Sequence, residues 1–147
     1  SHAEEILDNS RMFQIWFDPD ISKTISKPAS YSDYKLESFP LSKKEKSSVL
    51  TIKGKGSPFK MDSEGIEIYE INYDDGFHEI NLNSELVYSF FIKKGTLIHE
   101  NQNLAQGAFL KIDKESKLNF ESKNGLEIFK IISPLRTSYS TYYERFN

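Results

Sequence analysis

One histidine and one glutamate near the start of the chain form the pair best suited to metal chemistry. His2 and Glu4 are separated by a single residue, so on a strand both side chains would lie on one face and could reach one ion. Imidazole combined with carboxylate suits iron, nickel, manganese or zinc. The spacing also occurs often by chance, and Ser1-His2 could be left over from an expression vector. The pair therefore indicates at most a metal half-site.

The other two histidines, His78 and His99, are far apart in the sequence, and neither has a second histidine two positions away. For each of them, a surface or hydrogen-bonded structural role is favoured over metal ligation. The sequence has no cysteine, which excludes a thiol nucleophile, a disulfide framework and a cysteine-ligated zinc. It also lacks a Gly-x-Ser-x-Gly elbow, a phosphate-binding glycine loop and a His-Glu-x-x-His helix. We therefore assign no catalytic residue from motifs.

Length and composition predict a single globular domain. The chain has 147 residues, of which 37% are hydrophobic and 14% aromatic, with a net charge of −3. A chain of this length is expected to bury about 70% of its unfolded surface around one core. The acidic balance argues against nucleic acid as a partner, and the longest apolar run, Leu86–Ile92, is far shorter than the roughly 20 residues that span a bilayer. We expect a soluble, cytoplasmic domain.

Short apolar runs separated by turn residues predict an all-β sandwich or barrel. The expected strands are Met12–Phe17, Val49–Lys53, Ile66–Tyr73, Leu86–Ile92, Thr96–His99, Ala108–Asp113, Lys117–Glu121 and Leu126–Ile132. The expected glycine-containing turns are Asp74–Gly76, Lys93–Gly95, Gln106–Gly107 and Lys123–Gly125. Two segments lack this pattern of short strands and turns. Ser22–Ser48 is expected to be a long surface connection, and Ser133–Asn147 a short irregular or helical tail.

The alternation within strands predicts which side chains face the core. In Lys117–Glu121, Leu118 and Phe120 should point inward. In Ile66–Tyr73 the apolar residues occupy one alternating set of positions up to Ile68 and the other set from Tyr69 on. This change suggests a bulge or a strand buried on both faces. The aromatic residues have two interpretations. As packing residues, the core candidates are Trp16, Phe90, Phe91 and Phe109; as the lining of an apolar pocket at a barrel mouth, the candidates are Trp16, Tyr69, Tyr73, Phe90 and Phe109.

Several stretches, taken in order, resemble the pirin family of bicupin proteins, which includes quercetin-dioxygenase-like members. The likeness is to the second half of these proteins. Met12–Pro19, with its Gln-Ile-Trp, resembles the strand that follows the first cupin, and Pro28–Tyr31 resembles a Pro-x-x-Tyr piece of the connecting segment. Ser57–Tyr69 and Thr96–Phe109 resemble later strands in the same order. The resemblance spans nearly the whole chain.

This resemblance implies a cupin-type double-stranded β-helix, that is, a jelly-roll barrel. Residues 12–147 would be a single C-terminal cupin-like barrel, and residues 1–11 the end of a missing first cupin or a vector-derived lead. In the family a His-x-Glu at the place of His2 and Glu4 joins an upstream His-x-His to hold a metal ion. This chain has no His-x-His, so it would supply half a site. No cofactor is expected in this chain, and iron, nickel or manganese is expected in the complete parent.

Three functional hypotheses follow. The first is a metal-free C-terminal cupin, not itself catalytic, of a pirin-like protein whose complete form resembles a quercetin 2,3-dioxygenase-like oxidoreductase or a regulatory binder. The second is a self-contained β-barrel that binds a small aromatic molecule or a carbohydrate. The third is a stand-alone metalloenzyme in which His2, Glu4, His78 and His99 converge. An exposed strand or the missing first-cupin surface also predicts a homodimer.

Overall fold

The computed structural model describes residues 5–142 and Glu144, and it confirms an all-β fold. The helical elements are short: α1 spans Ile21–Thr24 and the 3-10 turn η1 spans Leu36–Ser38. The strands are β1 (Leu41–Lys44), β2 (Ser47–Lys53), β3 (Glu67–Tyr73), β4 (Gly76–Asn81), β5 (Leu86–His99), β6 (Gln102–Ala105), β7 (Phe109–Asp113) and β8 (Lys117–Pro134). Among the described residues no helix is long and apolar enough to cross a membrane.

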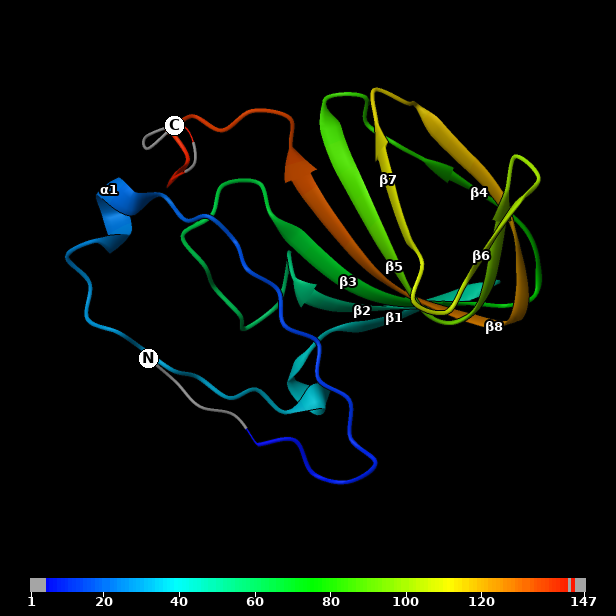
Figure 1. Cartoon of the computed structure of the whole chain (residues 1–147), viewed down its shortest axis with the longest axis horizontal. Helices are drawn as coiled ribbons and strands as arrows, with labels where there is room; N and C mark the ends of the chain where they lie inside the picture. Colours follow the sequence, from blue (N-terminus) through cyan, green and yellow to red (C-terminus); the bar gives the residue numbers. More distant parts are fainter. Residues whose placement is uncertain (1–4, 143, 145–147) are drawn as a thin grey trace.

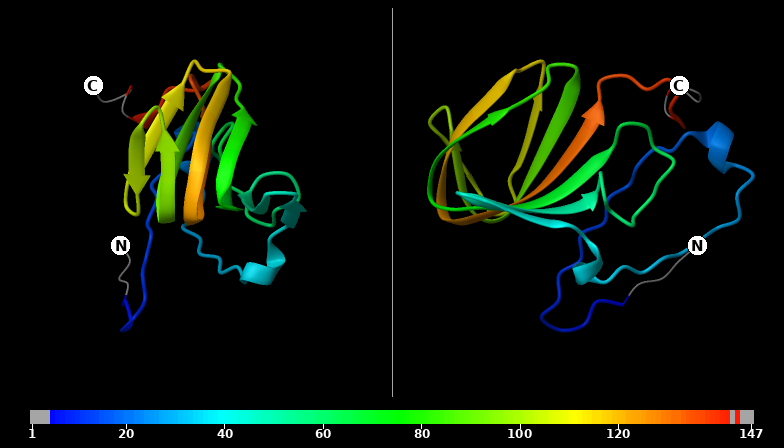
Figure 2. Two further views of the ribbon diagram at one scale, coloured as in Figure 1. Left: turned by 90° about the vertical axis from the view of Figure 1, so that its right-hand side faces the viewer. Right: turned by 180° about the vertical axis from the view of Figure 1, so that it is seen from behind.

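The long strands β5 and β8 pair antiparallel with each other and organise all the other strands (Figure 1). The first half of β5 and the second half of β8 carry β7 on one side and β3, β2 and β1 on the other. The remaining halves carry β6 and β4. Figure 2 shows the result from two further sides, a single sheet that folds over on itself into a barrel.

Two predicted turns, Lys93–Gly95 and Lys123–Gly125, are in fact bulges inside β5 and β8, so the expectation that the chain reverses there is wrong. The register between the two strands shifts at this place. Gly95, Asn124 and Gly125 all have positive φ, at 75°, 62° and 65°. The extra residues on each strand are absorbed by bulges, which bend both strands together. The bend carries each strand from one half of the barrel to the other.

The interior of the barrel is apolar and contains the predicted inward residues Leu118 and Phe120, together with Phe90. The buried cluster consists of Ile71, Tyr73, Tyr88, Phe90, Ile92, Leu97, Ile112, Leu118, Phe120, Leu126, Ile128 and Ile132. β3 is buried on both faces, as the change of apolar positions in its sequence suggested. Ile71 belongs to this interior cluster at 2% exposure, whereas Ile68 is 3% exposed but packs on the outer face.

The structure corrects several other expectations. Met12–Phe17 is not a strand, because no described strand pairs with it. Trp16 and Phe109 are not core residues, at 81% and 61% exposed. The strands β1, β4 and β6 were not predicted. Each is short, contains several polar residues and leaves many of its side chains exposed to solvent. The tail after β8 has little regular structure where it is described.

Replacing Gly95 with alanine should strongly destabilise the fold. A Cβ at this position would lie 2.8 Å from Leu126 Cα and 2.9 Å from the Gly125 carbonyl oxygen, in a backbone conformation with φ of 75°. The combined strain and overpacking should lower the free energy of unfolding by about 3 kcal/mol. Urea unfolding followed by far-UV circular dichroism measures this loss.

Gly107→Ala is the matched control. Gly107 also has positive φ, at 87°, but nothing lies within 4 Å of the Cβ it would gain. This variant should lose only about 1 kcal/mol, the cost of the backbone conformation. Equal losses in the two variants would contradict the close approach of β5 and β8 at Gly95.

Candidate functional site

Residues 11–19 form an N-terminal arm that lies against the outer face of the barrel without joining its sheet (Figure 1). Phe91 of β5 and Phe129 of β8 are paired across these two strands. Since their neighbours Phe90 and Ile128 are buried in the interior, Phe91 and Phe129 point outward. They form the surface on which the arm packs.

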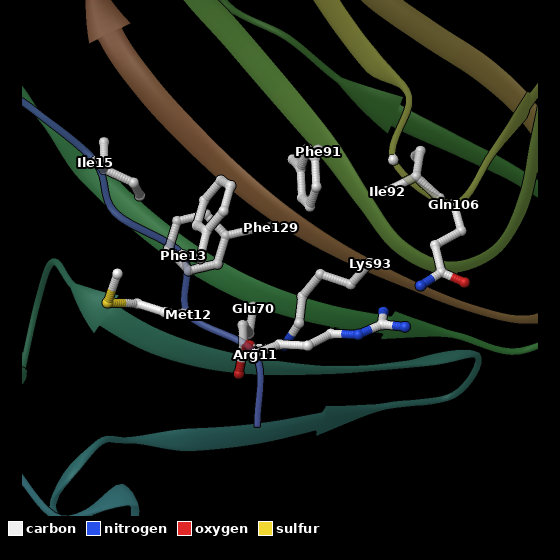
Figure 3. Close-up of a pocket in the computed structure, with 11 residues that line it drawn as sticks. Arg11, Met12, Phe13, Ile15, Glu70, Phe91, Ile92, Lys93, Gln106 and Phe129 are labelled. Carbon is white, nitrogen blue, oxygen red and sulfur yellow. Dashed lines mark hydrogen bonds and ion pairs between the residues drawn. The ribbon is translucent and has the colours of Figure 1, made fainter. Parts of the chain in front are cut away.

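Phe13 attaches the arm to this surface through aromatic contacts. Its ring stacks on Phe91 with centroids 4.7 Å apart and an interplanar angle of 26°. It also makes an edge contact with the Phe129 ring, with the two centroids 5.3 Å apart. Each such pair contributes about 0.5–1.5 kcal/mol beyond burial. The three rings form an aromatic clamp, defined here as Phe13, Phe91 and Phe129 (Figure 3).

A cavity of about 510 Å³ lies beside the aromatic clamp, between the arm and the barrel (Figure 3). Its walls are largely apolar, and charged or amide side chains stand at its rim. The lining residues are Arg11, Met12, Phe13, Ile15, Glu70, Phe91, Ile92, Lys93, Gln106, Gly107 and Phe129. The volume falls within the range that accommodates small organic ligands.

The polar groups of this cavity come from three parts of the chain. Lys93 of β5 forms an ion pair with Glu70 of β3, so these two charges compensate each other. Arg11 comes from the arm and Gln106 from the turn between β6 and β7. A guanidinium and an amide offer several hydrogen-bond donors to an anionic or carbonyl group. The arrangement can therefore orient a flat apolar molecule by one polar end.

The other end of the arm is fixed by hydrogen bonds. Tyr139 Oη donates to the Asp18 carbonyl at 3.2 Å, and the Asp20 backbone N–H donates to the Asp62 carbonyl at 3.0 Å. Asp20 also caps α1, because its Oδ1 accepts a hydrogen bond from the Ser22 backbone N–H at 3.1 Å. The Ser22 hydroxyl donates to the same oxygen at 2.6 Å and holds the pKa of Asp20 below its ordinary value. A second apolar hollow of about 410 Å³ lies under the arm. The arm is thus held at both ends.

The described histidines have structural partners. His78 Nε2 lies 2.7 Å from the Asp74 carbonyl oxygen, and its ring stacks on Phe120 at 5.3 Å. His99 Nδ1 lies 2.8 Å from the Asn119 carbonyl oxygen. A ring nitrogen beside a carbonyl acts as a donor. His2 and Glu4 lie outside the described residues, and among residues 5–142 and Glu144 no three or more His, Asp or Glu side chains gather where they could hold a metal.

The five aromatic residues proposed as a pocket lining lie in different places. Phe90 and Tyr73 are buried in the barrel, and burial raises the pKa of Tyr73 to about 12. Tyr69 is half-buried on the inner face, whereas Trp16 and Phe109 are exposed. None of the five lines the cavity beside the aromatic clamp.

Sequence reasoning missed Phe13, Phe129 and Arg11 as lining residues. A signal for Phe129 was present, because Phe129, like Phe91, stands among apolar residues that must alternate between two faces of a strand. A strand with apolar residues on both faces requires a covering element outside the barrel. Nothing in the sequence shows that the arm is that element.

Phe13→Ala should loosen the arm. Removing two aromatic contacts costs about 1–3 kcal/mol of local stability, so the detached population and the rate of trypsin cleavage after Arg11 should rise at least about fivefold. Limited proteolysis with mass spectrometry measures this rate. Phe77→Ala is the control, because Phe77 on β4 is 79% exposed; an equal acceleration in both variants would show that Phe13 does not hold the arm.

Comparisons with known proteins identify the fold alone. No family model matches the chain, and no curated protein matches it. Among solved structures, ectoine synthase from P. lautus is similar with a TM-score of 0.56 and 10% identity, over 71% of this chain and 78% of that protein. A protein designated GK1651 from Geobacillus kaustophilus is similar with a TM-score of 0.60 and 17% identity, over 77% of this chain and 50% of that one.

A third similar structure is the Cupin_2 domain of an XRE-family transcriptional regulator from Enterobacter cloacae. Its TM-score is 0.50 at 9% identity, and the match covers 63% of this chain and all of that domain. Identities this low carry no activity across, and the similar proteins include both an enzyme and a regulator domain. Together with the antiparallel barrel built on β5 and β8, they show that this chain has the cupin fold.

Proposed function

We propose that this chain is the C-terminal, non-catalytic cupin domain of a pirin-like protein, and that its N-terminal arm docks it onto a preceding cupin. The cupin fold supports the proposal at the level of architecture. The arm contains Gln14-Ile15-Trp16, the part of the sequence with the most specific resemblance to the pirin family. In that family this segment is the strand that follows the first cupin.

The observation that carries the proposal is the two-sided character of the arm. One side packs on the barrel through Phe13, and Ile15 and Phe17 are half-buried against it. The other side presents Trp16, which is 81% exposed. A large exposed aromatic side chain beside other apolar residues is typical of an interface. The preceding cupin is the occupant that the resemblance places next to this segment.

The barrel interior supports a role in binding and assembly rather than in catalysis. Its largest fully buried side chains are all apolar apart from Ser122 and fill the space between the two halves of the sheet: Phe90, Ile92, Leu97, Leu118, Leu126 and Ile128. The described residues do not by themselves fit a metal site. In the complete protein, His2 and Glu4 would join ligands from the preceding cupin to hold iron, nickel or manganese.

The Trp16 surface should cause self-association when the preceding cupin is absent. We expect this chain alone to form a homodimer, and Trp16→Ser to weaken the dimer at least tenfold, because buried tryptophan often dominates interface energies. Light scattering over a concentration series measures the change. Phe77→Ser, which removes another exposed aromatic side chain, should leave the dimer intact.

The same tryptophan tests the docking itself, because Trp16 is the only tryptophan in the sequence. In a longer polypeptide that includes the upstream cupin, Trp16 should be shielded from acrylamide quenching and the homodimer should be lost. An upstream reading frame without a His-x-His cupin, or full quenching of Trp16 in the longer protein, would contradict the proposal.

A second candidate function is supported by the cavity beside the aromatic clamp. Its volume of about 510 Å³, its aromatic walls and the donors of Arg11 and Gln106 suit a flat aromatic molecule with one anionic group. This would make the chain a small-molecule binder independent of any preceding domain. The site lies on the outside of the barrel and not at its mouth.

2-Naphthoate is a suitable probe for this second function. We expect binding with a Kd between about 10 μM and 1 mM, seen as amide shifts of Phe91, Gly107 and Phe129 in NMR spectra. Phe91→Ala should weaken binding at least fivefold, and Phe77→Ala should not affect it. Equal affinities of the Phe91→Ala variant and the unmodified chain would exclude the cavity as the binding site.

A further inference from the structure

A hollow lined by lysines lies beside the segment that connects β2 to β3. Its volume is about 320 Å³, and its walls come from residues 53–55, 59–61 and 65–67. The charged side chains among them are Lys53, Lys55, Lys60 and Glu67. The hollow shares no lining residue with the cavity beside the aromatic clamp. It is therefore a separate feature, with an excess of positive charge in a chain whose net charge is −3.

A buried serine fixes the turn that carries one of these lysines. Ser57 is 3% exposed, and its backbone N–H donates to the Gly54 carbonyl at 3.2 Å. Its hydroxyl donates to the Ile52 carbonyl at 2.5 Å and accepts a hydrogen bond from the Phe59 N–H at 3.1 Å. These local bonds fix the path of the backbone through the turn. They also fix the positions from which the lysines around the turn extend.

Two of the lysines are held in place by backbone carbonyl groups. Lys53 Nζ donates to the Ile66 carbonyl at 2.6 Å, and Lys60 Nζ donates to the Ser57 carbonyl at 2.9 Å. An ammonium group has three hydrogens, so each of these lysines keeps two for a ligand. Among residues 5–142 and Glu144, neither of them forms an ion pair, and Lys55 forms none either. The hollow thus contains positioned donors whose charge no carboxylate neutralises at close range.

The charges around the hollow do not balance. Glu67 is the single carboxylate among its described lining residues, and one of its oxygens, Oε2, already accepts the Tyr69 hydroxyl hydrogen at 2.5 Å. Burial lowers the pKa of Lys53, Glu67 raises it, and Lys60 lowers it, so the charges of Lys53 and Lys60 act on each other. Three ammonium groups face one carboxylate. An anion placed among the lysines would offset their mutual repulsion.

We propose that this hollow binds the phosphate group of a small phosphate monoester. Such a group carries about −1.5 to −2 charges at neutral pH and has three acceptor oxygens. This matches the excess of positive charge and the donors of Lys53, Lys55 and Lys60. The side chains of Phe59 and Met61 line the rest of the hollow and suit a short apolar group attached to the phosphate. The site is one of binding alone and does not depend on the function proposed above.

Phenyl phosphate is the probe for this site, because it joins a phosphate dianion to one small apolar ring. At about pH 7.5 and low salt we expect a Kd between about 50 μM and 1 mM, with shifts of the Gly54, Gly56 and Ile66 amides in NMR spectra. Inorganic phosphate lacks the ring and phenyl sulfate carries a single negative charge, so each should bind at least about threefold more weakly. Phe91→Ala should leave these affinities unchanged, since Phe91 lines the other cavity.

Variants of the lining residues test the assignment. Lys53→Gln and Lys60→Gln should each weaken phenyl phosphate binding at least about fivefold, because each removes a positioned charged donor. Lys114→Gln is the matched control, since Lys114 is exposed between β7 and β8 and its loss changes the net charge equally. Glu67→Gln should strengthen binding at least about twofold, a gain that a damaged fold does not produce.

Three results would overturn the proposal. The first is that Lys53→Gln and Lys60→Gln bind phenyl phosphate as tightly as Lys114→Gln. The second is weaker binding to Glu67→Gln than to the unmodified chain. The third is that phenyl sulfate or inorganic phosphate binds as tightly as phenyl phosphate, which would show that neither the second charge nor the attached group is recognised.

Discussion

The antiparallel pairing of β5 with β8 is the interaction on which the rest of the structure depends. Every other strand except β1 and β2 pairs directly with one of these two, and β2 joins through β3. The two strands bend at the same place, where Gly95 lies too close to the backbone of Leu126 for any side chain to fit. A bulge on each strand keeps the pairing on both sides of the bend. This shared bend makes a barrel out of one continuous sheet.

The same pairing creates the need for the arm. Phe90 and Ile128 face the interior, so their neighbours Phe91 and Phe129 must face outward. An outward aromatic pair in the middle of a sheet exposes a large apolar surface unless something covers it. Phe13 stacks on that pair and covers part of it. The cavity next to it is the part that the arm leaves open, and Trp16 on the far side of the arm extends the apolar surface outward.

Three polar side chains on the inner face lie together in one region of the barrel. Apolar residues fill most of the interior, whereas Glu67, Tyr69 and Lys130 are neighbours on β3 and β8. Tyr69 satisfies Glu67 through a hydrogen bond and Lys130 through its ring. Each of these groups is polar at its tip and carries a long apolar portion that packs against the barrel wall. The barrel therefore accommodates a charged cluster without opening its core.

The sequence by itself determined the strand-forming segments and the inward side of most of them, because alternation of apolar and polar residues acts over neighbouring positions. Leu118, Phe120 and Phe90 lie in the core as that pattern predicts. Only the tertiary structure decided that Lys93–Gly95 and Lys123–Gly125 are bulges, since a glycine-rich stretch serves a turn or a bulge equally well until its partner strand is known. It also decided that Phe13, although 51% exposed, packs on the barrel while Trp16, three residues on, is 81% exposed. That choice depends on Phe91 and Phe129, which are distant in sequence and meet the arm only after β5 and β8 have paired.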